Sequence, residues 1–359
     1  MKRPEGTEMR KKARGKYERR CGVDKASLKK VVAAIKRYKR FLITTHTSPE
    51  GDAIGSELAF YHLLRKLGKT AVVINESHFP AELNFLPGKE RIVVYKPNLK
   101  KIGFDCMVVL DCSDLNRAGQ VCKLNKGNKP VINIDHHISN NNFGIVNLVD
   151  AGASSASEVV YSLYKEMRVP FDKDSALVLY VGMMTDTGSF RYSNTSGFTH
   201  KAVGELMRFG FDVRRTYSNI YESIPFAGTQ LLIKILSNVH LTAKGRIAWV
   251  EVPAKSLRHK KLSFDLSEQI LSFIRVIKDT QVVALFRENL GAKKEIHFNL
   301  RSNGIVDVNK IAQVFGGGGH KSASGCTMAG KLSEVRRKVI ANIRHNLKYL
   351  TAIAPRGCE

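Results

Sequence analysis

A carboxylate and two imidazoles follow the apolar run Val131–Ile134 as Asp135, His136 and His137. A short run rich in Val and Ile is typical of a buried β-strand. The three side chains would therefore leave the carboxyl end of a strand, the edge at which open α/β sheets bind ligands. Because imidazole and carboxylate groups are common ligands of transition-metal ions, the triplet indicates a metal site.

Three further apolar segments release acidic or imidazole side chains where they end. These segments are Phe41–Thr45, Met107–Leu110 and Leu177–Met184. The candidates that follow them are, in chain order, His46, Glu50, Asp52, Asp111 and Asp186. Acidic residues at such places are also ordinary loop starts and helix N-caps, and a lone Asp-His-His occurs by chance. Four endings of the same kind on one chain favour a metal-dependent enzyme.

The donor set contains nitrogen and oxygen but no sulfur, which suits Mn²⁺, Fe²⁺, Co²⁺ or Zn²⁺. The set is large enough for two ions if Asp111 bridges them. Two ions about 3.5–4 Å apart are the usual arrangement for in-line attack of water on phosphorus. The net charge of +26 fits an anionic phosphoester substrate better than an amide or a sugar.

A run of four glycines, Gly316–Gly319, forms a second candidate site with His320, Lys321 and Ser322 after it. Glycines allow backbone N–H groups to approach an anion closely, as in phosphate-binding nests. The run is not a Walker A loop, which would need glycine in place of His320. A flexible turn is the alternative, but the polar residues after the run favour binding. So does Arg301-Ser302, which ends a predicted strand upstream.

Composition limits the class of protein. The 359 residues suffice for two domains, and the apolar share of 43% suffices for packed cores. No run approaches the ~20 apolar residues that a membrane span needs, and the basic start lacks the apolar segment of a secretory signal. The six cysteines form no C-x-x-C pair, as expected of reduced thiols. We therefore expect a cytoplasmic protein.

The positive charge is partly concentrated at the start of the chain. Residues 1–20 contain nine Lys or Arg and three Asp or Glu, and almost no large apolar side chains. This composition predicts a flexible basic tail over 1–23. The remaining excess is spread along the chain. A polyanionic substrate or nucleic acid would explain it, and simple solubility would explain it equally well.

Alternating apolar segments predict the fold of the first part of the chain. Strands are expected at 41–45, 71–74, 107–110 and 131–134, and helices at 28–38, 53–67, 155–167 and 174–184. This alternation is typical of an α/β fold with a mainly parallel, doubly wound sheet and helices on both faces. We place this catalytic domain at 24–200.

The pattern changes beyond residue 200. A mostly helical linker is expected over 201–228, followed by a second domain over 229–352. The second domain is predicted to be smaller and also α/β. Its expected strands lie at 246–251, 281–286 and 295–300, and its closing amphipathic helix at 332–350.

Six ordered motifs resemble those of the DHH phosphoesterases. Segment 46–56, HTSPEGDAIGS, is similar to their first motif, H-x-x-P-D-x-D-A-x-G-S. Asp111-Cys112-Ser113 with Arg117 and Gly119 resembles the second motif, Asp135-His136-His137 the signature, and TDTGSF at 185–190 the fourth. Segments 299–302 (NLRS) and 315–320 (FGGGGH) are similar to the accompanying DHHA1 domain. The resemblance covers about 25–350.

The resemblance implies which residues hold metal. One Mn²⁺ would be held by His46, Glu50 and Asp111, and a second by Asp52, Asp111, His136 and Asp186. Asp135 would orient an imidazole, as carboxylates often do, and His137 would face the scissile phosphate and help to protonate the leaving oxygen. Glu50 departs from the family pattern, which has Asp. Its longer side chain is expected to loosen one ion or to alter the metal preference.

The resemblance also implies a substrate-binding role for the second domain, with the active site in the cleft between the domains. The residues expected to hold the far phosphate and nucleotide are Arg301, Ser302, Gly317, Gly318, Gly319 and His320. Arg117 and Arg191 are further candidates for phosphate contacts. An arginine after a strand is, however, often only a surface ion-pair partner.

The most similar members of the family are stand-alone oligoribonucleases of the nanoRNase type, which also act on 3′-phosphoadenosine 5′-phosphate. The resemblance implies the same two activities here, with Mn²⁺ as cofactor, short RNA or small nucleotides as substrates and a homodimer as the assembly. A cyclic dinucleotide phosphodiesterase would share every motif. A RecJ-like single-strand DNA exonuclease and a non-catalytic nucleic-acid binder are less favoured, because the former are longer and the metal-site residues are intact.

Overall fold

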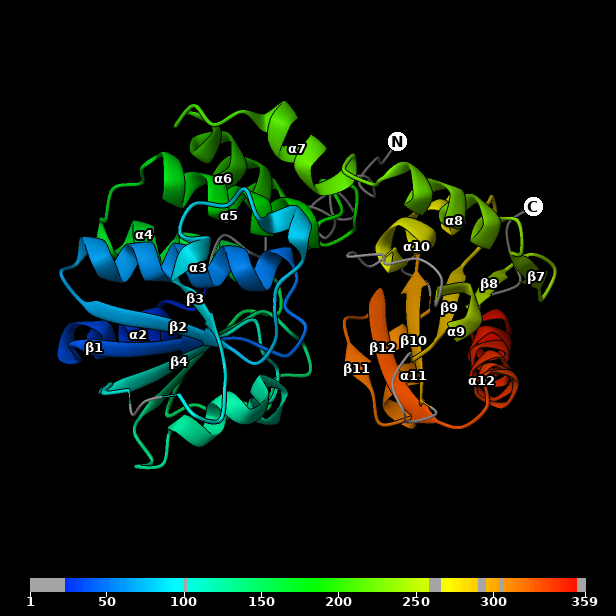
Figure 1. Cartoon of the computed structure of the whole chain (residues 1–359), viewed down its shortest axis with the longest axis horizontal. Helices are drawn as coiled ribbons and strands as arrows, with labels where there is room; N and C mark the ends of the chain where they lie inside the picture. The colour runs from blue at the N-terminus through cyan, green and yellow to red at the C-terminus, as the bar shows by residue number, and fades with distance from the viewer. Residues whose placement is uncertain (1–22, 100–101, 258–265, 290–294, 304–305, 354–359) are drawn as a thin grey trace, which may run out of the picture. The chain divides into compact units, whose positions relative to one another are not determined.

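A computed structural model describes residues 23–99, 102–257, 266–289, 295–303 and 306–353 (Figure 1). The chain divides into two compact units, Met1–Ile220 and Tyr221–Glu359, which we describe one at a time. The predicted basic tail, 1–23, lies outside the described residues except for Val23. No helix in the described ranges is long and apolar enough to span a membrane.

The first unit contains a parallel sheet with the strand order β3-β2-β1-β4-β5-β6. The strands are β1 (Arg40–Thr44), β2 (Thr70–Asn75), β3 (Ile92–Val94), β4 (Cys106–Leu110), β5 (Val131–Asp135) and β6 (Val146–Val149). Every residue of β4 is buried, because a central parallel strand is covered on both faces. The predicted mainly parallel sheet is confirmed.

Helices lie on both faces of this sheet, but the two layers differ (Figure 1). One face carries mutually packed α-helices, which are α3 (Gly51–Lys66), α4 (Ala156–Met167), α5 (Lys173–Asp186) and α6 (Gly197–Met207). The opposite face is covered by the 3₁₀ helix η3 (Leu115–Leu124) and by irregular segments that carry Phe104 and Phe143. The remaining helical elements are α2 (Lys25–Arg37), η1 (Ala81–Leu83), η2 (Lys89–Arg91) and α7 (Val213–Tyr221).

The second unit contains a mixed sheet with the order β11-β12-β10-β9-β8-β7. Its strands are β7 (His240–Thr242), β8 (Ile247–Val252), β9 (Val282–Glu288), β10 (Glu295–Ser302), β11 (Gly318–Gly319) and β12 (Ala323–Ala329). Only the β8–β9 pair is parallel among the described pairs. This arrangement agrees with the second α/β domain predicted from the sequence.

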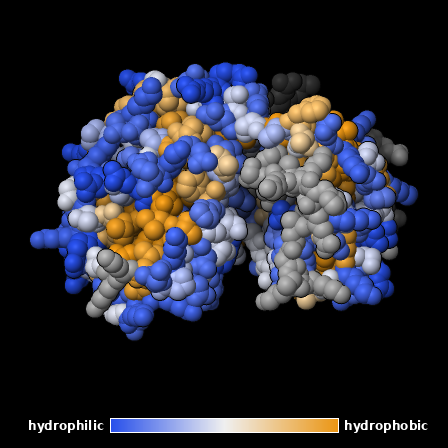
Figure 2. All heavy atoms as spheres, viewed as in Figure 1, coloured by the Kyte–Doolittle hydropathy of each residue, from blue (hydrophilic) through white to orange (hydrophobic). Residues whose placement is uncertain are grey.

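Each face of the second sheet has its own hydrophobic core. One core joins Phe286 and Phe298 to helices α11 (Val308–Val314) and α12 (Leu332–Ile353). The other joins Val250 and neighbouring strand residues to α8 (Phe226–Leu236) and α10 (Ser267–Ile274). A short helix, α9 (Ala254–Leu257), follows β8. Hydrophilic side chains cover much of the surface visible in Figure 2, and apolar areas appear on both units, the largest on the first.

Candidate metal centre

Three neighbouring strands of the first unit deliver the central residues of the site. β1, β4 and β5 are adjacent, so His46, Asp111 and the triplet Asp135–His137 leave the sheet at one edge. The chain runs from β1 outward to β2 on one side, and from β4 outward to β5 on the other. This reversal opens a crevice at the carboxyl ends of β1 and β4, where doubly wound sheets bind ligands.

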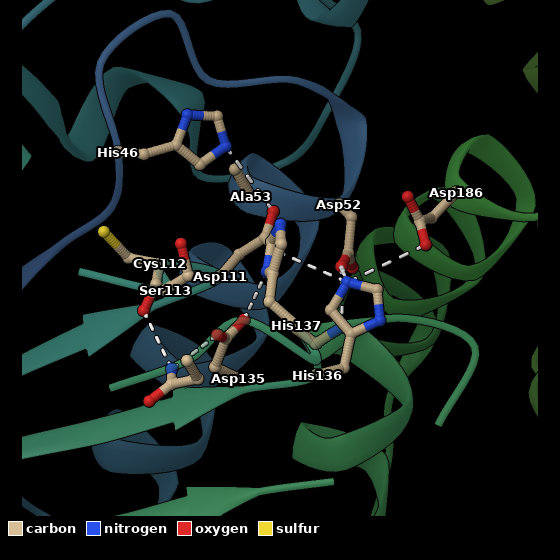
Figure 3. Close-up of polar contacts among 12 residues, drawn as sticks. His46, Asp52, Ala53, Asp111, Cys112, Ser113, Asp135, His136, His137 and Asp186 are labelled. Atoms are coloured by element: carbon tan, nitrogen blue, oxygen red, sulfur yellow. Dashed lines mark hydrogen bonds and ion pairs between the residues drawn. The ribbon is translucent and has the colours of Figure 1, made fainter. Parts of the chain in front are cut away.

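Two helices bring Asp52 and Asp186 to the same edge (Figure 3). Asp52 lies in the first turn of α3, and Asp186 is the last residue of α5. Gly182 on α5 permits this approach, because a Cβ there would lie 1.9 Å from Ser157 Oγ and 2.7 Å from Asp52 Oδ1. A larger residue would push the helices apart and displace the carboxylates.

The amino end of α4 fixes the Asp52 carboxylate. Asp52 Oδ2 accepts a hydrogen bond from the backbone N–H of Ala156 at 2.6 Å, and Oδ1 accepts one from Ser157 at 2.9 Å. Backbone N–H groups at a helix amino terminus favour negative charge. Ser155 caps this helix by accepting a hydrogen bond from the N–H of Glu158 at 3.0 Å. Asp52 is therefore held in one orientation by groups that do not compete for its remaining lone pairs.

Asp111 lies between two imidazoles. Its Oδ2 is 3.7 Å from His46 Nε2, and its Oδ1 is 3.5 Å from His136 Nε2. Asp111 also adopts a left-handed backbone conformation with φ of 50°, which costs a non-glycine residue about 1 kcal/mol or more. Strain of this kind persists where the surrounding structure fixes it, and functional sites are common places for it. The conformation turns the carboxylate toward both imidazoles.

Three carboxylate oxygens surround His136 Nε2: Asp111 Oδ1 at 3.5 Å, Asp52 Oδ2 at 3.7 Å and Asp186 Oδ2 at 3.8 Å. These separations exceed ordinary hydrogen bonds of 2.7–3.2 Å. Ligand atoms about 2.0–2.2 Å from one ion lie roughly 3–3.5 Å from one another. In addition, the buried Asp111 Oδ1 has no hydrogen-bond partner in the described part of the chain. The cluster fits a divalent cation, and its donor set matches the ions that the sequence predicts.

A second pair stands beside this cluster. Asp135 is fully buried, and its Oδ1 lies 2.7 Å from His137 Nδ1. Its Oδ2 accepts a hydrogen bond from Asn140 Nδ2 at 2.5 Å. The carboxylate therefore holds the proton of His137 on Nδ1 and fixes the orientation of the ring. Asp135 orients His137, whereas the ring of His136 is placed with its Nδ1 3.4 Å from the carbonyl oxygen of Ala153.

The ionisation of the cluster reflects its crowded charges. Burial, followed by the negative charge of Asp111, raises the pKa of Asp52 to about 8. Burial opposes ionisation of Asp111 too, but His136 and His46 outweigh it and hold the pKa of Asp111 well below its ordinary value. The neighbouring carboxylates likewise outweigh burial and raise the pKa of His136 well above its ordinary value. Positive charge would relieve the repulsion among these convergent carboxylates, and a bound cation would supply it.

Other residues predicted for the first domain lie at the margin of this cluster. Glu50 is exposed and occupies the N-cap position of α3. Arg117 is also exposed; its Nη1 donates to Ser113 Oγ at 3.3 Å, and its charge is felt at His46, where it opposes the rise in the pKa of that imidazole. Arg191 follows α5 and donates from Nε to the carbonyl oxygen of Gly188 at 2.7 Å.

The second unit contains three of the residues that were predicted to bind substrate, Arg301, Ser302 and His320. Arg301 forms an ion pair with Glu268 of α10, and Ser302 is buried at the end of β10. The backbone N–H of His320 donates to the carbonyl oxygen of Ala323 at 2.7 Å. An ion pair already engages the Arg301 guanidinium, so any phosphate contact there would have to share or displace Glu268.

The glycines of the loop Gly316–Gly319 differ in how closely other atoms approach them. A Cβ on Gly317 would lie 2.2 Å from the carbonyl oxygen of Gly325, and one on Gly319 would lie 2.5 Å from that of Ala323. These two glycines are required because β12 passes close by. A Cβ on Gly318 would meet nothing nearer than 3.8 Å. The fold of this unit therefore accounts for Gly317 and Gly319 but not for Gly318.

Two supporting asparagines were not predicted from the sequence. Asn140 donates to Asp135, and Asn194 Nδ2 donates to Asp186 Oδ2 at 3.3 Å and to the carbonyl oxygen of Ser154 at 3.0 Å. Both lie in loops, where polar residues are frequent and carry no pattern. The sequence offers one signal that Asn140 supports the site, namely its position three residues after His137, and such a spacing is common by chance.

Comparison with known proteins identifies the two units. The DHH family N-terminal domain matches residues 40–183, and the DHHA1 domain matches residues 247–347. The chain belongs to the DHH family. Its members are phosphoesterases, so this DHH protein is a hydrolase, as the sequence motifs predicted. The matched ranges contain the Asp–His cluster in the first unit and the glycine loop in the second.

Relatives resemble the DHH protein over most of its length. The bifunctional oligoribonuclease and PAP phosphatase NrnA of Thermus thermophilus is 29% identical over 307 residues, 85% of this chain and 89% of the relative. The Bacillus subtilis protein of the same name is 26% identical, covering 83% and 92%. The crystal structure of an exopolyphosphatase-related protein from Bacteroides fragilis has a TM-score of 0.80 at 27% identity, covering 92% and 98%.

Proposed function

We propose that this DHH protein is a Mn²⁺-dependent phosphoesterase that hydrolyses short RNA oligonucleotides to mononucleotides and also acts on 3′-phosphoadenosine 5′-phosphate. The observation that carries the proposal is Asp111, whose two oxygens face two different imidazoles within a crevice of convergent carboxylates. The names of the relatives supply the substrate class. The net charge of +26 supports an anionic substrate.

The proposed ligands divide into two sets that share Asp111. The first set is His46, Glu50 and Asp111, and the second is Asp52, Asp111, His136 and Asp186. Two bound Mn²⁺ ions would neutralise phosphoryl oxygens and lower the pKa of water, so that it attacks phosphorus at neutral pH. The exposure of Glu50 makes the first set the more accessible to solvent. We therefore expect its ion to exchange more readily than that of the second set, in which Asp52, Asp111 and His136 are buried and Asp186 is partly buried.

His137 is proposed to act on the leaving group. Asp135 accepts a hydrogen bond from Nδ1 at 2.7 Å, which orients the ring. Nε2 can then donate a proton to the oxygen that leaves phosphorus and recover one from solvent afterwards. Asp135 acts as a positioning residue in this scheme, and Asn140 positions Asp135.

The second unit is proposed to bind the rest of the nucleotide. Gly318 supports this assignment, because there is room for a Cβ at this position and the packing of the unit therefore does not require glycine there. A backbone N–H without a neighbouring Cβ can approach a phosphate closely. Arg301, Ser302, His320, Arg117 and Arg191 remain the proposed polar contacts to substrate. A homodimer and a cytoplasmic location also remain predictions.

A substrate panel tests this function. We would measure hydrolysis of a dinucleotide, a five-nucleotide RNA, a 24-nucleotide RNA, 3′-phosphoadenosine 5′-phosphate and cyclic di-AMP, each with Mn²⁺, with Mg²⁺ and with EDTA. The proposal expects Mn²⁺-dependent turnover that is fastest on the shortest linear RNAs. Faster turnover of cyclic di-AMP would assign the same centre to a cyclic dinucleotide phosphodiesterase instead.

Two other outcomes would contradict the proposal. Processive degradation of long single-stranded DNA would indicate a RecJ-like exonuclease. Binding of RNA with no turnover in any metal would indicate a non-catalytic binder. The Asp111→Asn variant serves as the negative control in every assay, because both proposed ligand sets depend on that carboxylate.

A further inference from the structure

A pocket of about 700 Å³ lies in the second unit, between the β7–β8 edge of the sheet and helix α12. It is lined by aromatic, cationic and a few apolar side chains, among them His240, Leu241, Trp249, Arg336, Arg337 and Arg344. None of these residues belongs to the metal centre or to the glycine loop. The proposed hydrolysis therefore gives no account of this pocket.

Stacked rings form one wall of the pocket. His240 and Trp249 are cross-strand neighbours in β7 and β8, and their ring centroids lie 4.3 Å apart at an interplanar angle of 21°. The Arg336 guanidinium carbon lies 4.8 Å from the centre of the Trp249 ring. Trp249 is half-buried whereas His240 is exposed. The imidazole thus extends an aromatic column to the surface, where a planar ring can stack on it.

Positive charge forms the opposite wall. Arg337, Arg344 and His345 are exposed on α12 and line the pocket. Over Leu332–Ile353 the sequence has five Lys or Arg against one Glu. Glu251, a neighbouring acid, pairs with Arg336 at 3.2 Å. Arg344 donates a hydrogen bond to the hydroxyl of Thr242, which carries no charge. Glu251 therefore compensates Arg336, and the contact of Arg344 leaves its positive charge to attract an anion.

The strand register separates this pocket from the glycine loop. Paired residues run across the sheet from Gly319 through Ser324, Leu300, Ala284 and Trp249 to His240. This row crosses five strand intervals of about 4.8 Å, so its ends lie roughly 24 Å apart. A dinucleotide held at the glycine loop cannot reach His240. The pocket is therefore a separate site at the other edge of the same sheet.

We propose that this pocket binds a single-stranded segment of RNA as a second site, separate from the metal centre. A base would stack on His240 at the end of the Trp249 column, and the flanking phosphates would contact Arg337 and Arg344. Alternating aromatic and cationic side chains are the usual means of holding single strands without reading their sequence. A merely solvated helix face would not place its arginines around a cavity that contains a ring stack.

The sequence provides a direct probe, because Trp249 is the only tryptophan in the chain. The experiment titrates full-length protein carrying Asp111→Asn with a 24-nucleotide RNA and follows tryptophan fluorescence. Asp111→Asn prevents hydrolysis during the measurement and leaves the pocket intact. We expect a saturable change in fluorescence, which inorganic polyphosphate of equal charge does not reproduce because it has no base to stack. Unchanged fluorescence at saturating RNA, or an equal response to polyphosphate, would overturn the proposal.

Variants with matched controls test the residues. Arg337→Ala with Arg344→Ala should weaken RNA binding and reduce the slope of log K against log salt by about 1.4, since each single-strand phosphate contact contributes about 0.7. The control is Lys331→Ala with Lys338→Ala, which removes the same charge from exposed residues outside the pocket. Equal salt slopes for the two double variants would contradict the assignment. His240→Ala should weaken binding roughly tenfold through lost stacking.

This second site and the proposed hydrolase activity can fail independently. In the enzyme with Asp111 intact, Arg337→Ala with Arg344→Ala should leave dinucleotide hydrolysis unchanged and raise the KM for the 24-nucleotide RNA. An equal loss of activity on both substrates would indicate instead that these arginines contact the substrate bound at the metal centre. If the substrate panel shows no hydrolysis at all, the fluorescence titration still tests RNA binding at Trp249.

Discussion

The Asp–His centre and the glycine loop are built in opposite ways. In the centre, buried carboxylates are held by the groups around them: Asp52 by backbone N–H groups at the amino end of α4, and Asp135 by the side chains of His137 and Asn140. In the loop, the proposed contacts to substrate come from the backbone, because glycines have no side chains. Removing a functional group from the centre should therefore abolish chemistry without unfolding the chain. In the loop, replacing a single glycine by alanine should distinguish the glycines that the fold requires from the glycine that is proposed to contact substrate.

The largest effect is expected from Asp111→Asn. The amide keeps the size of the side chain but removes the charge between His46 and His136, so turnover should fall by at least about 10³-fold. The melting temperature should be retained. Steady-state hydrolysis of a dinucleotide with Mn²⁺ measures the loss.

Asp105→Asn is the matched control for Asp111→Asn. Asp105 precedes β4, whereas Asp111 follows it, and Asp105 pairs with Arg40 at 2.7 Å near the surface. This substitution removes the same charge from the other end of the same strand and should leave turnover unchanged. If both variants lose activity equally, the effect belongs to the folding of β4 rather than to the centre.

Asn140→Ala should have a smaller effect on the same centre. Loss of its hydrogen bond frees one oxygen of Asp135, so that His137 is oriented less well. A decrease in kcat of roughly 10–100-fold is expected, with KM nearly unchanged. Asn141→Ala is the control, because Asn141 Nδ2 donates to the partly exposed Asp114 at 2.8 Å. A rise in KM together with the fall in kcat would instead indicate that Asn140 contacts the substrate.

Gly317 and Gly318 of the glycine loop are expected to respond differently to replacement by alanine. Gly317→Ala should destabilise the second unit by about 2 kcal/mol or more, since its Cβ would overlap the carbonyl oxygen of Gly325. Gly318→Ala should leave stability within about 0.5 kcal/mol and raise KM for short RNA roughly tenfold. Denaturant unfolding and steady-state kinetics measure the two effects. If Gly318→Ala leaves KM unchanged, the loop does not approach the substrate at that residue.

The sequence predicts the centre better than the rest of the fold, for a physical reason. Side chains at the ends of buried parallel strands must converge, so His46, Asp111 and His136 can be grouped from the sequence alone. β12 was not predicted, because Ala323–Ala329 has no alternation of apolar residues and owes its strand form to pairing with β10. β6 and β7 were also missed: they are short edge strands, and their pairing is a tertiary property.

The supporting groups of the centre could not be predicted for a related reason. The link from Asp52 to the backbone of Ala156 joins residues 104 positions apart, and no local pattern encodes such a contact. The glycine loop gave an ambiguous signal. Its four glycines look alike in the sequence, whereas the structure separates those that β12 requires from Gly318.

The smallest effect concerns Glu57, a buried acid of α3 that the proposed chemistry does not use. Its Oε2 accepts a hydrogen bond from Asn75 Nδ2 at 2.8 Å, and burial raises its pKa to about 8. The folded chain therefore keeps this proton at pH values where the unfolded chain, with a pKa near 4.5, has released it. Stability from this residue must fall as the pH rises from about 4.5 to about 8, and must level off above.

Glu57→Gln should remove that dependence without affecting turnover. The amide retains an acceptor for Asn75 Nδ2 and offers a donor to Asn75 Oδ1, which has no hydrogen-bond partner among the described residues. Relative to the variant, the native protein should lose on the order of 1–3 kcal/mol of unfolding free energy between pH 5 and pH 8. Urea unfolding at both pH values in EDTA measures the difference, and Asp52 contributes equally to both proteins. Parallel pH profiles would mean that Glu57 is ionised in the fold and that a nearby positive charge compensates it.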